Sequence, residues 1–297
     1  MATAGLDGGE DGPADATVLR MLLGAQLRRF REAAGITPEA AGYEIRASAS
    51  KVNRLEKGKV RLKARDVVDL LALYGVTDDT VQAEFLAFAG RSGEPDWWAR
   101  YRDIVPGWFE TYIGLEAAAS AIRSFEVQFV PGLFQTEDYA QAVTIPPHPP
   151  RRPALADDAE RRVALRLKRQ DLLSRPDAPW VWAVVDEAVL RRAAGGPAVM
   201  RAQFRRLIEL AALERVTIQV IPFARGIHAA ESGSFTILRF AERDLPDVVY
   251  TEQLTGARYL DQRQDVEQYL QVASELSRQA LTPAATIGFI EQAARDL

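Results

Sequence analysis

The chain has 297 residues, of which 47% are hydrophobic and 26% charged, and it carries a net charge of −4 at pH 7. These proportions are typical of a globular protein of two domains, and no stretch approaches the roughly 18–20 consecutive apolar residues of a membrane span. The absence of cysteine excludes a disulfide framework, a thiolate nucleophile and a cysteine-ligated zinc site. We therefore expect a cytoplasmic protein with no membrane partner.

The first 17 residues contain four acidic side chains and no basic one. A secretory signal peptide would need basic residues followed by an apolar run. We therefore expect a disordered acidic leader over residues 1–17.

A compact all-α domain is predicted over residues 18–90. Thr37 and Ser48 are good N-cap residues, Pro38 occupies a first helical position, and Asp66 is expected to cap a later helix. Gly35, Gly58 and Gly75 end helices. Together with the apolar spacing, these signals predict five short helices, over residues 18–34, 37–45, 49–56, 67–74 and 80–89.

The second and third helices, separated by residues 46–48, have the spacing of a helix-turn-helix. In this motif the second helix enters the major groove of DNA and its exposed residues contact base edges. On a helical wheel, Ala49, Ser50, Asn53 and Arg54 lie opposite the apolar Val52 and Leu55. These side chains are of the types that read base edges.

Charge is distributed unevenly along the chain. Residues 18–65 contain 12 Lys or Arg and four Asp or Glu, a local charge of +8, so that the rest carries −12. Because charges beyond about 8–10 Å are screened at cellular ionic strength, the local value governs attraction to phosphate. The sequence therefore favours binding of double-stranded DNA by this segment, although a solvated basic face on a helical domain is the simpler alternative.

Residues 27–73 resemble the Xre (lambdoid phage repressor-like) helix-turn-helix family in the motifs LRRFREAAGITPEAAG and SASKVNRLEKGK. The resemblance implies a structural ion pair between Arg31 and Glu56. It implies base contacts from Ala49, Ser50 and Arg54. Phosphate contacts are expected from Thr37, Lys51, Asn53, Lys57, Lys59, Arg61 and Lys63. The family usually has Gln where this chain has Pro38, so one phosphate contact is expected to be lost.

Residues 91–95 are predicted to be a linker, because Gly90–Pro95 is rich in turn-forming residues. Beyond it, residues 96–297 are predicted to form one mixed α/β or α+β domain. Strands are expected over residues 122–130, 180–185, 217–221, 234–240 and 248–252. Helices are expected over residues 155–173, 187–194, 199–213, 265–276 and 282–294.

The segment FEVQFVPGLFQTEDYA, with VDEAVLRR, TIQVIP and GSF further on, resembles an uncharacterised domain that follows this helix-turn-helix in many actinobacterial regulators. The resemblance implies a regulatory domain for sensing, dimerisation or partner binding. Such regulators are often encoded beside a very small protein, which is therefore a candidate partner. No ligand is implied.

Catalysis is poorly supported by the sequence. The chain has two histidines, His148 and His228, and it lacks the metalloprotease, P-loop, dinucleotide-binding and nucleophile-elbow motifs. We therefore expect no enzyme activity, metal or cofactor. Four carboxylates lie near strand ends, where surface or helix-capping roles are favoured over acid–base roles: Glu126, Glu137, Asp186 and Glu187.

Two further features leave several readings open. The aromatic residues between Trp97 and Tyr112 fit core packing, a subunit interface or a cage for an organic ligand. The arginine-rich helix that begins near Leu155 fits a solvated face, a surface for an acidic partner or a second DNA contact. A ligand or partner pocket, if present, is assigned to Trp108, Phe134, Gln135 and His228.

The leading hypothesis is a homodimeric, nucleoid-associated transcriptional regulator that binds specific DNA sites and responds to a ligand or partner. An antitoxin-like interaction protein, in which DNA binding is secondary to a small neighbouring protein, is the alternative. An enzyme tethered to DNA is a third reading, and it would need a pocket with convergent polar groups.

Overall fold

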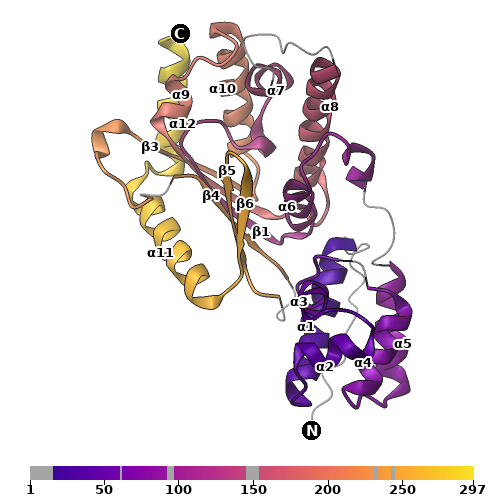
Figure 1. Ribbon diagram of the computed structural model, residues 1–297. Helices are drawn as coiled ribbons and strands as arrows, with labels where there is room; N and C mark the ends of the chain where they lie inside the picture. The colour runs from indigo at the N-terminus through magenta and orange to yellow at the C-terminus, as the bar shows by residue number, and fades with distance from the viewer. Residues whose placement is uncertain (1–15, 61, 92–96, 145–153, 231–232, 242–244) are drawn as a thin grey trace. The chain divides into compact units, whose positions relative to one another are not determined.

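The computed structural model describes residues 16–60, 62–91, 97–144, 154–230, 233–241 and 245–297 (Figure 1). The chain divides into two compact units, Met1–Trp97 and Trp98–Leu297. Most of the predicted leader and linker, as well as Arg61 and His148, lie outside the described residues. Within the described part, no helix combines the length and apolar character that crossing a membrane requires.

The first unit contains the five predicted helices: α1 (Ala16–Ala33), α2 (Pro38–Glu44), α3 (Ala49–Glu56), α4 (Ala64–Leu73) and α5 (Asp79–Arg91). The predicted start of α4 was wrong by three residues. Lys63, and not Asp66, is its N-cap residue, and it provides no side-chain cap. Asp66 lies in the first turn, where its carboxylate pairs with the Lys51 ammonium at 3.4 Å. The Asp66 carboxylate thus pairs with a side chain of α3 and does not cap α4.

The core of the first unit is formed where α1, α3 and α4 meet. Leu27, Val52, Leu55 and Leu70 are almost completely buried there. The approach of α1 to α3 depends on Gly24, because a Cβ at this position would lie 2.5 Å from the carbonyl oxygen of Leu55. The end of α3 is therefore seated directly on the backbone of α1.

The second unit contains one mixed sheet in the order β3-β2-β1-β4-β5-β6. The central strand β1 is parallel to β2 and antiparallel to β4. Strand β6 was not predicted; it forms a hairpin with β5 across a two-residue connection, Leu254 and Thr255. The strands are β1 (Ala121–Glu126), β2 (Trp180–Asp186), β3 (Val216–Ile221), β4 (Phe235–Arg239), β5 (Val248–Gln253) and β6 (Gly256–Leu260).

Helices cover both faces of this sheet. In Figure 1, α11 crosses one face, while α6 and α8 lie against the other. The α-helices of the unit are α6 (Gly107–Ala118), α7 (Glu137–Thr144), α8 (Ala154–Arg169), α9 (Glu187–Arg191), α10 (Pro197–Ala211), α11 (Arg263–Gln279) and α12 (Pro283–Arg295). Short 3-10 helices span Trp97–Tyr101, Gly132–Phe134, Gln170–Ser174 and Phe223–Arg225.

Two arginines of α8 make contacts within the domain, so a solvated face, one of the three readings left open for this helix, does not describe them. Arg169 is buried and binds Glu116 of α6 through two hydrogen bonds of 2.7 Å. Its guanidinium also lies about 5 Å from the rings of Phe109 and Tyr112. Arg166 is partly buried and donates to the side chain of Gln135 at 3.1 Å. A buried guanidinium is tolerated here because a carboxylate and aromatic faces replace its water.

Candidate nucleic-acid interface

Two side-chain caps define the helix pair α2 and α3. The Thr37 hydroxyl accepts from the amide of Ala40 at 3.2 Å, and the Ser48 hydroxyl accepts from the amide of Lys51 at 3.2 Å. Each cap satisfies an amide that the first turn of a helix leaves without a partner. These caps start both helices at the positions that the sequence indicates.

The turn between the two helices is tight. The amide of Ala47 donates to the carbonyl of Gly42 at 2.7 Å, and Arg46 adopts a φ of 51°, in the left-handed region. A Cβ at position 42 would lie 2.7 Å from the Ala47 carbonyl oxygen. Glycine in the middle of α2 is therefore required for α3 to leave the turn at this angle.

The face of α3 that points away from the core carries the residues proposed to read bases. Val52 and Leu55 are buried, whereas Ser50, Asn53 and Arg54 are exposed. Ala49 is partly exposed at the first position of the helix. Among the described residues, no side chain donates to or accepts from the side chains of Ser50, Asn53 or Arg54. This face is therefore free to make contacts with another molecule.

Ion pairs within the first unit partly neutralise several of its positive charges. Arg28 pairs with Glu32, Arg65 lies near Asp69, and Lys51 lies near Asp66. Within the described part of the first unit, five exposed cations have no partner among its carboxylates, and all five lie on α3 or on the segments that flank it: Arg46, Arg54, Lys57, Lys59 and Lys63. The positive charge that remains for a partner is thus concentrated around α3.

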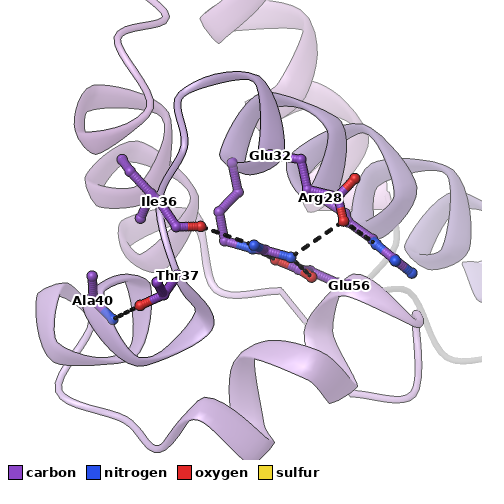
Figure 2. Close-up of polar contacts among 7 residues, drawn as sticks. Arg28, Glu32, Ile36, Thr37, Ala40 and Glu56 are labelled. Atoms are coloured by element: carbon purple, nitrogen blue, oxygen red, sulfur yellow. Dashed lines mark hydrogen bonds and ion pairs between the residues drawn. The ribbon is translucent and has the colours of Figure 1, made fainter.

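The structure brings Arg31 and Glu56 together as an ion pair, and Figure 2 shows Glu56 with the neighbouring Ile36 and Glu32. The Arg31 Nε and Nη2 atoms donate to the two carboxylate oxygens of Glu56 at 2.6 and 2.9 Å, and Nη1 donates to the carbonyl of Ile36 at 2.9 Å. The hydrogen bond to Glu56 raises the pKa of Arg31. Burial raises the pKa of the neighbouring Tyr74 phenol to about 12. The pair is structural, because both side chains are buried.

Sequence reasoning missed two exposed groups beside the turn. Tyr43 on α2 is 87% exposed, and Arg46 follows it in the turn itself. Both are neighbours of the α3 N-terminus in the chain. An aromatic residue at the last turn of a short helix is usually interpreted as a core residue, so only its exposure in the structure marks Tyr43 as a surface group.

Comparison with protein-family models gives two matches. Residues 22–84 match a helix-turn-helix domain, and residues 109–292 match a domain of unknown function (DUF5753). The chain belongs to the DUF5753 family. The helix-turn-helix match indicates a DNA-binding regulator and agrees with the exposed cationic face of α3. No curated protein and no solved structure matches the chain.

The four residues assigned to a pocket in the DUF5753 domain contact separate sets of neighbours. Phe134 and Gln135 are fully buried, and the Gln135 amide donates to the Val130 carbonyl at 2.7 Å. The Trp108 carbonyl accepts from the Tyr259 hydroxyl. His228 Nδ1 accepts from the Ala230 amide at 3.2 Å, and the ring packs edge-on against Phe125. These contacts place Gln135 in the internal framework of the domain.

The carboxylates near strand ends have different roles in the DUF5753 domain. Asp186 caps α9 by accepting from the amide of Ala188 at 2.8 Å, as expected. Glu187 is buried and accepts from the amide of Phe223 and from Arg191. Glu126, the last residue of β1, is partly buried, and it caps no helix among the described residues.

The environment of Glu126 favours its neutral form. Burial is the main cause, and the nearby Glu252 carboxylate acts in the same direction, so that the pKa of Glu126 rises to about 7. A hydrogen bond from Ser234 and the positive charge of Arg166 oppose this rise. Burial, with the help of Arg169, lowers the pKa of Arg166 to about 10. An acidic and a basic side chain, Glu126 and Arg166, therefore lie close enough to affect each other's pKa.

Proposed function

We propose that the chain is a sequence-specific regulator of transcription of the Xre type that binds double-stranded DNA through α3. Ala49, Ser50 and Arg54 are assigned to base edges, because they lie on the outward face of this helix. The observation that carries the proposal is that the exposed cations without a carboxylate partner in the described part of the first unit are concentrated around α3. The other side of α3 is buried in the core, which fixes the orientation of this helix. The guanidinium of an arginine such as Arg54 can donate two hydrogen bonds to the O6 and N7 atoms of guanine in the major groove.

Phosphate contacts are assigned to the flanking residues. Lys57, Lys59 and Lys63 are exposed and follow one another at the end of α3 and in the connection to α4. Asn53 and the hydroxyl of Thr37 add neutral donors, while Lys51 shares its charge with Asp66. Arg61, in the same connection, is assigned the same role from the sequence alone. Contacts of this kind set the register of a protein on DNA without reading its sequence.

The DUF5753 domain is proposed to respond to a small ligand or to a small partner protein. A single helix-turn-helix covers a few base pairs, and paired half-sites about one helical turn apart are the usual way to lengthen the site. A homodimer is therefore part of the proposal. The net charge of −12 outside residues 18–65 supports a body that does not itself bind nucleic acid.

The proposal is tested by selecting genomic DNA fragments with the purified full-length chain at about 50 and 200 mM salt. We expect enrichment of a discrete motif at low salt and a smaller yield of the same motif at high salt, because counterion release weakens binding. The matched control is Arg54→Ala, which should still retain DNA at low salt but with the base preference relaxed at one position of the motif. Failure of the wild-type chain to enrich any motif at low salt would contradict the proposal.

A further inference from the structure

A cavity of about 380 Å³ lies between α11 and strands β1, β2 and β4. Its floor is apolar and consists of Phe125, Val184 and Phe235. The register places Phe125 opposite both Val184 and Phe235, so that the three side chains share one face of the sheet. This volume and this lining are those of small-molecule sites, which are mostly apolar with a few placed polar groups.

Arg123 stands at the edge of this cavity on the central strand β1. Its guanidinium lies 5.8 Å from the ring centroid of Trp182, its partner in the register. Among the described residues, no carboxylate or carbonyl oxygen accepts a hydrogen bond from it. Asp247 on the same side of the sheet is occupied by Arg239, with contacts of 2.7, 3.0 and 3.1 Å. Arg123 is thus a cation without a counter-ion in the part of the chain that the structure describes.

Trp182 forms a wall of the cavity and is fixed in position. Its indole Nε1 donates to Gln219 at 2.7 Å, and the Gln219 amide donates in turn to the carbonyls of Ser277 and Leu281 at 3.2 and 2.8 Å. Trp182 is still 36% exposed. The hydrogen bonds fix the orientation of the Trp182 ring, and part of the residue remains exposed. The ring can therefore stack against a planar ligand without rearranging.

The polar groups that α11 brings to the cavity already have acceptors of their own. The hydroxyls of Ser274 and Ser277 donate to carbonyls of their own helix at 2.8 and 2.9 Å. Arg278 pairs with Glu275. Within the described lining, Arg123 is therefore the charged donor that has no partner, and the oxygens of Ser274 and Ser277 are left as acceptors.

We propose that this cavity binds a small planar aromatic carboxylate, with its ring between Trp182 and the apolar floor and its carboxylate on Arg123. A guanidinium and a carboxylate form two parallel hydrogen bonds, which adds orientation to affinity. The site deepens the ligand-responsive role proposed above, and its regulatory meaning rests on that role. The binding itself does not depend on DNA.

The test uses the full-length chain, without DNA, and three probes of equal shape: 2-naphthoate, its uncharged amide and 2-naphthylmethylammonium. Isothermal titration calorimetry should show that the carboxylate binds about tenfold or more tightly than the amide, the ratio expected for a charge-assisted pair. The ammonium should bind most weakly. Arg123→Gln should remove the preference for the carboxylate while leaving the affinity for the amide unchanged.

Two further variants make the result decisive. Arg258→Gln changes an exposed arginine on β6 outside the cavity and should leave the affinity for all probes unchanged. Trp182→Leu should weaken both the carboxylate and the amide. Thermal unfolding confirms that each variant is folded. Absence of binding by wild type, equal binding of carboxylate and amide, or self-association that Arg123→Gln abolishes would each overturn the proposal. None of these outcomes bears on the selection of DNA by α3.

Discussion

The guanidinium of Arg31 holds both carboxylate oxygens of Glu56 and, with its third nitrogen, the carbonyl of Ile36. One side chain of α1 thus fixes the end of α3 and the turn that precedes α2. Because α3 is only eight residues long, it is too short to hold its own orientation. The ion pair and the contact at Gly24 supply this orientation.

Arg31→Leu should destabilise the first unit by about 3–5 kcal/mol, because Glu56 is left charged and buried. The double variant Arg31→Leu/Glu56→Leu should recover most of this loss, since no unpaired charge remains. All five tryptophans lie at position 97 or later. Urea unfolding followed by circular dichroism therefore reports both units, and tryptophan fluorescence mainly the second. Equal destabilisation in the single and double variants would contradict a dominant role for the unpaired charge.

Gly42→Ala should lower the stability of the first unit and weaken DNA binding, because the new methyl group meets the Ala47 carbonyl at 2.7 Å. The control is Gly288→Ala in α12, where a Cβ meets no atom within 4 Å. That change should stabilise the second unit by about 0.5–1 kcal/mol through helix propensity. Thermal unfolding of both variants provides the measurement. If Gly42→Ala left both stability and DNA binding unchanged, the turn between α2 and α3 would be shown to widen enough for a methyl group.

Arg54→Ala should reduce affinity for the selected site by about 1–3 kcal/mol and relax the base preference at one position. Lys59→Ala should weaken binding to all sequences and reduce the slope of log affinity against log salt by about 1. Fluorescence anisotropy over a salt series separates the two effects. Arg201→Ala, an exposed arginine on α10, serves as the control. If Arg54→Ala changed only the salt slope, Arg54 would be a phosphate contact.

Glu126 should make the stability of the second unit depend on pH. Its pKa is raised from an ordinary value of 4.5 to about 7 in the folded state, so the folded chain binds the proton more tightly than the unfolded chain. Stability therefore falls as pH rises from about 4.5 to about 7, by on the order of 2–3 kcal/mol. Glu126→Gln should raise stability at pH 8 and change it little at pH 4.5.

Urea unfolding at pH 4.5 and 8 checks this prediction, with Asp138→Asn as a control, since Asp138 is an exposed residue of α7. The difference between the two variants isolates the contribution of Glu126 from the general effect of acid on the chain. An identical pH dependence in wild type and Glu126→Gln would show that Glu126 is ionised in the folded chain at neutral pH.

The helices of the first unit could be predicted because their signals are local. Thr37 and Ser48 cap helices that begin at the next residue, and both are visible as single residues before an amphipathic segment. Strand β6 was missed because its hairpin uses Leu254 and Thr255, which lack the Asn-Gly or Asp-Gly signature of tight turns.

The interior of the second unit could not be predicted in the same way. Arg169 belongs to the polar side of a helical pattern, and only the placement of Glu116, 53 positions earlier, accounts for its burial. Arg123 and Trp182 become neighbours through the register of β1 with β2. Such pairs depend on the strand order and the packing of the helices, and no residue pattern near either partner in the sequence predicts them.

The strand order also sets a sequence of events during synthesis. The five helices of the first unit contact one another within residues 16–91. One edge of β1, by contrast, pairs with β4, which follows more than 100 residues later in the chain. At about 5–20 residues per second, the ribosome needs several seconds or more to cover that interval. The DNA-binding unit can therefore complete its core while β1 still has an open edge, and chaperones that shield nascent strands would act on the second unit alone.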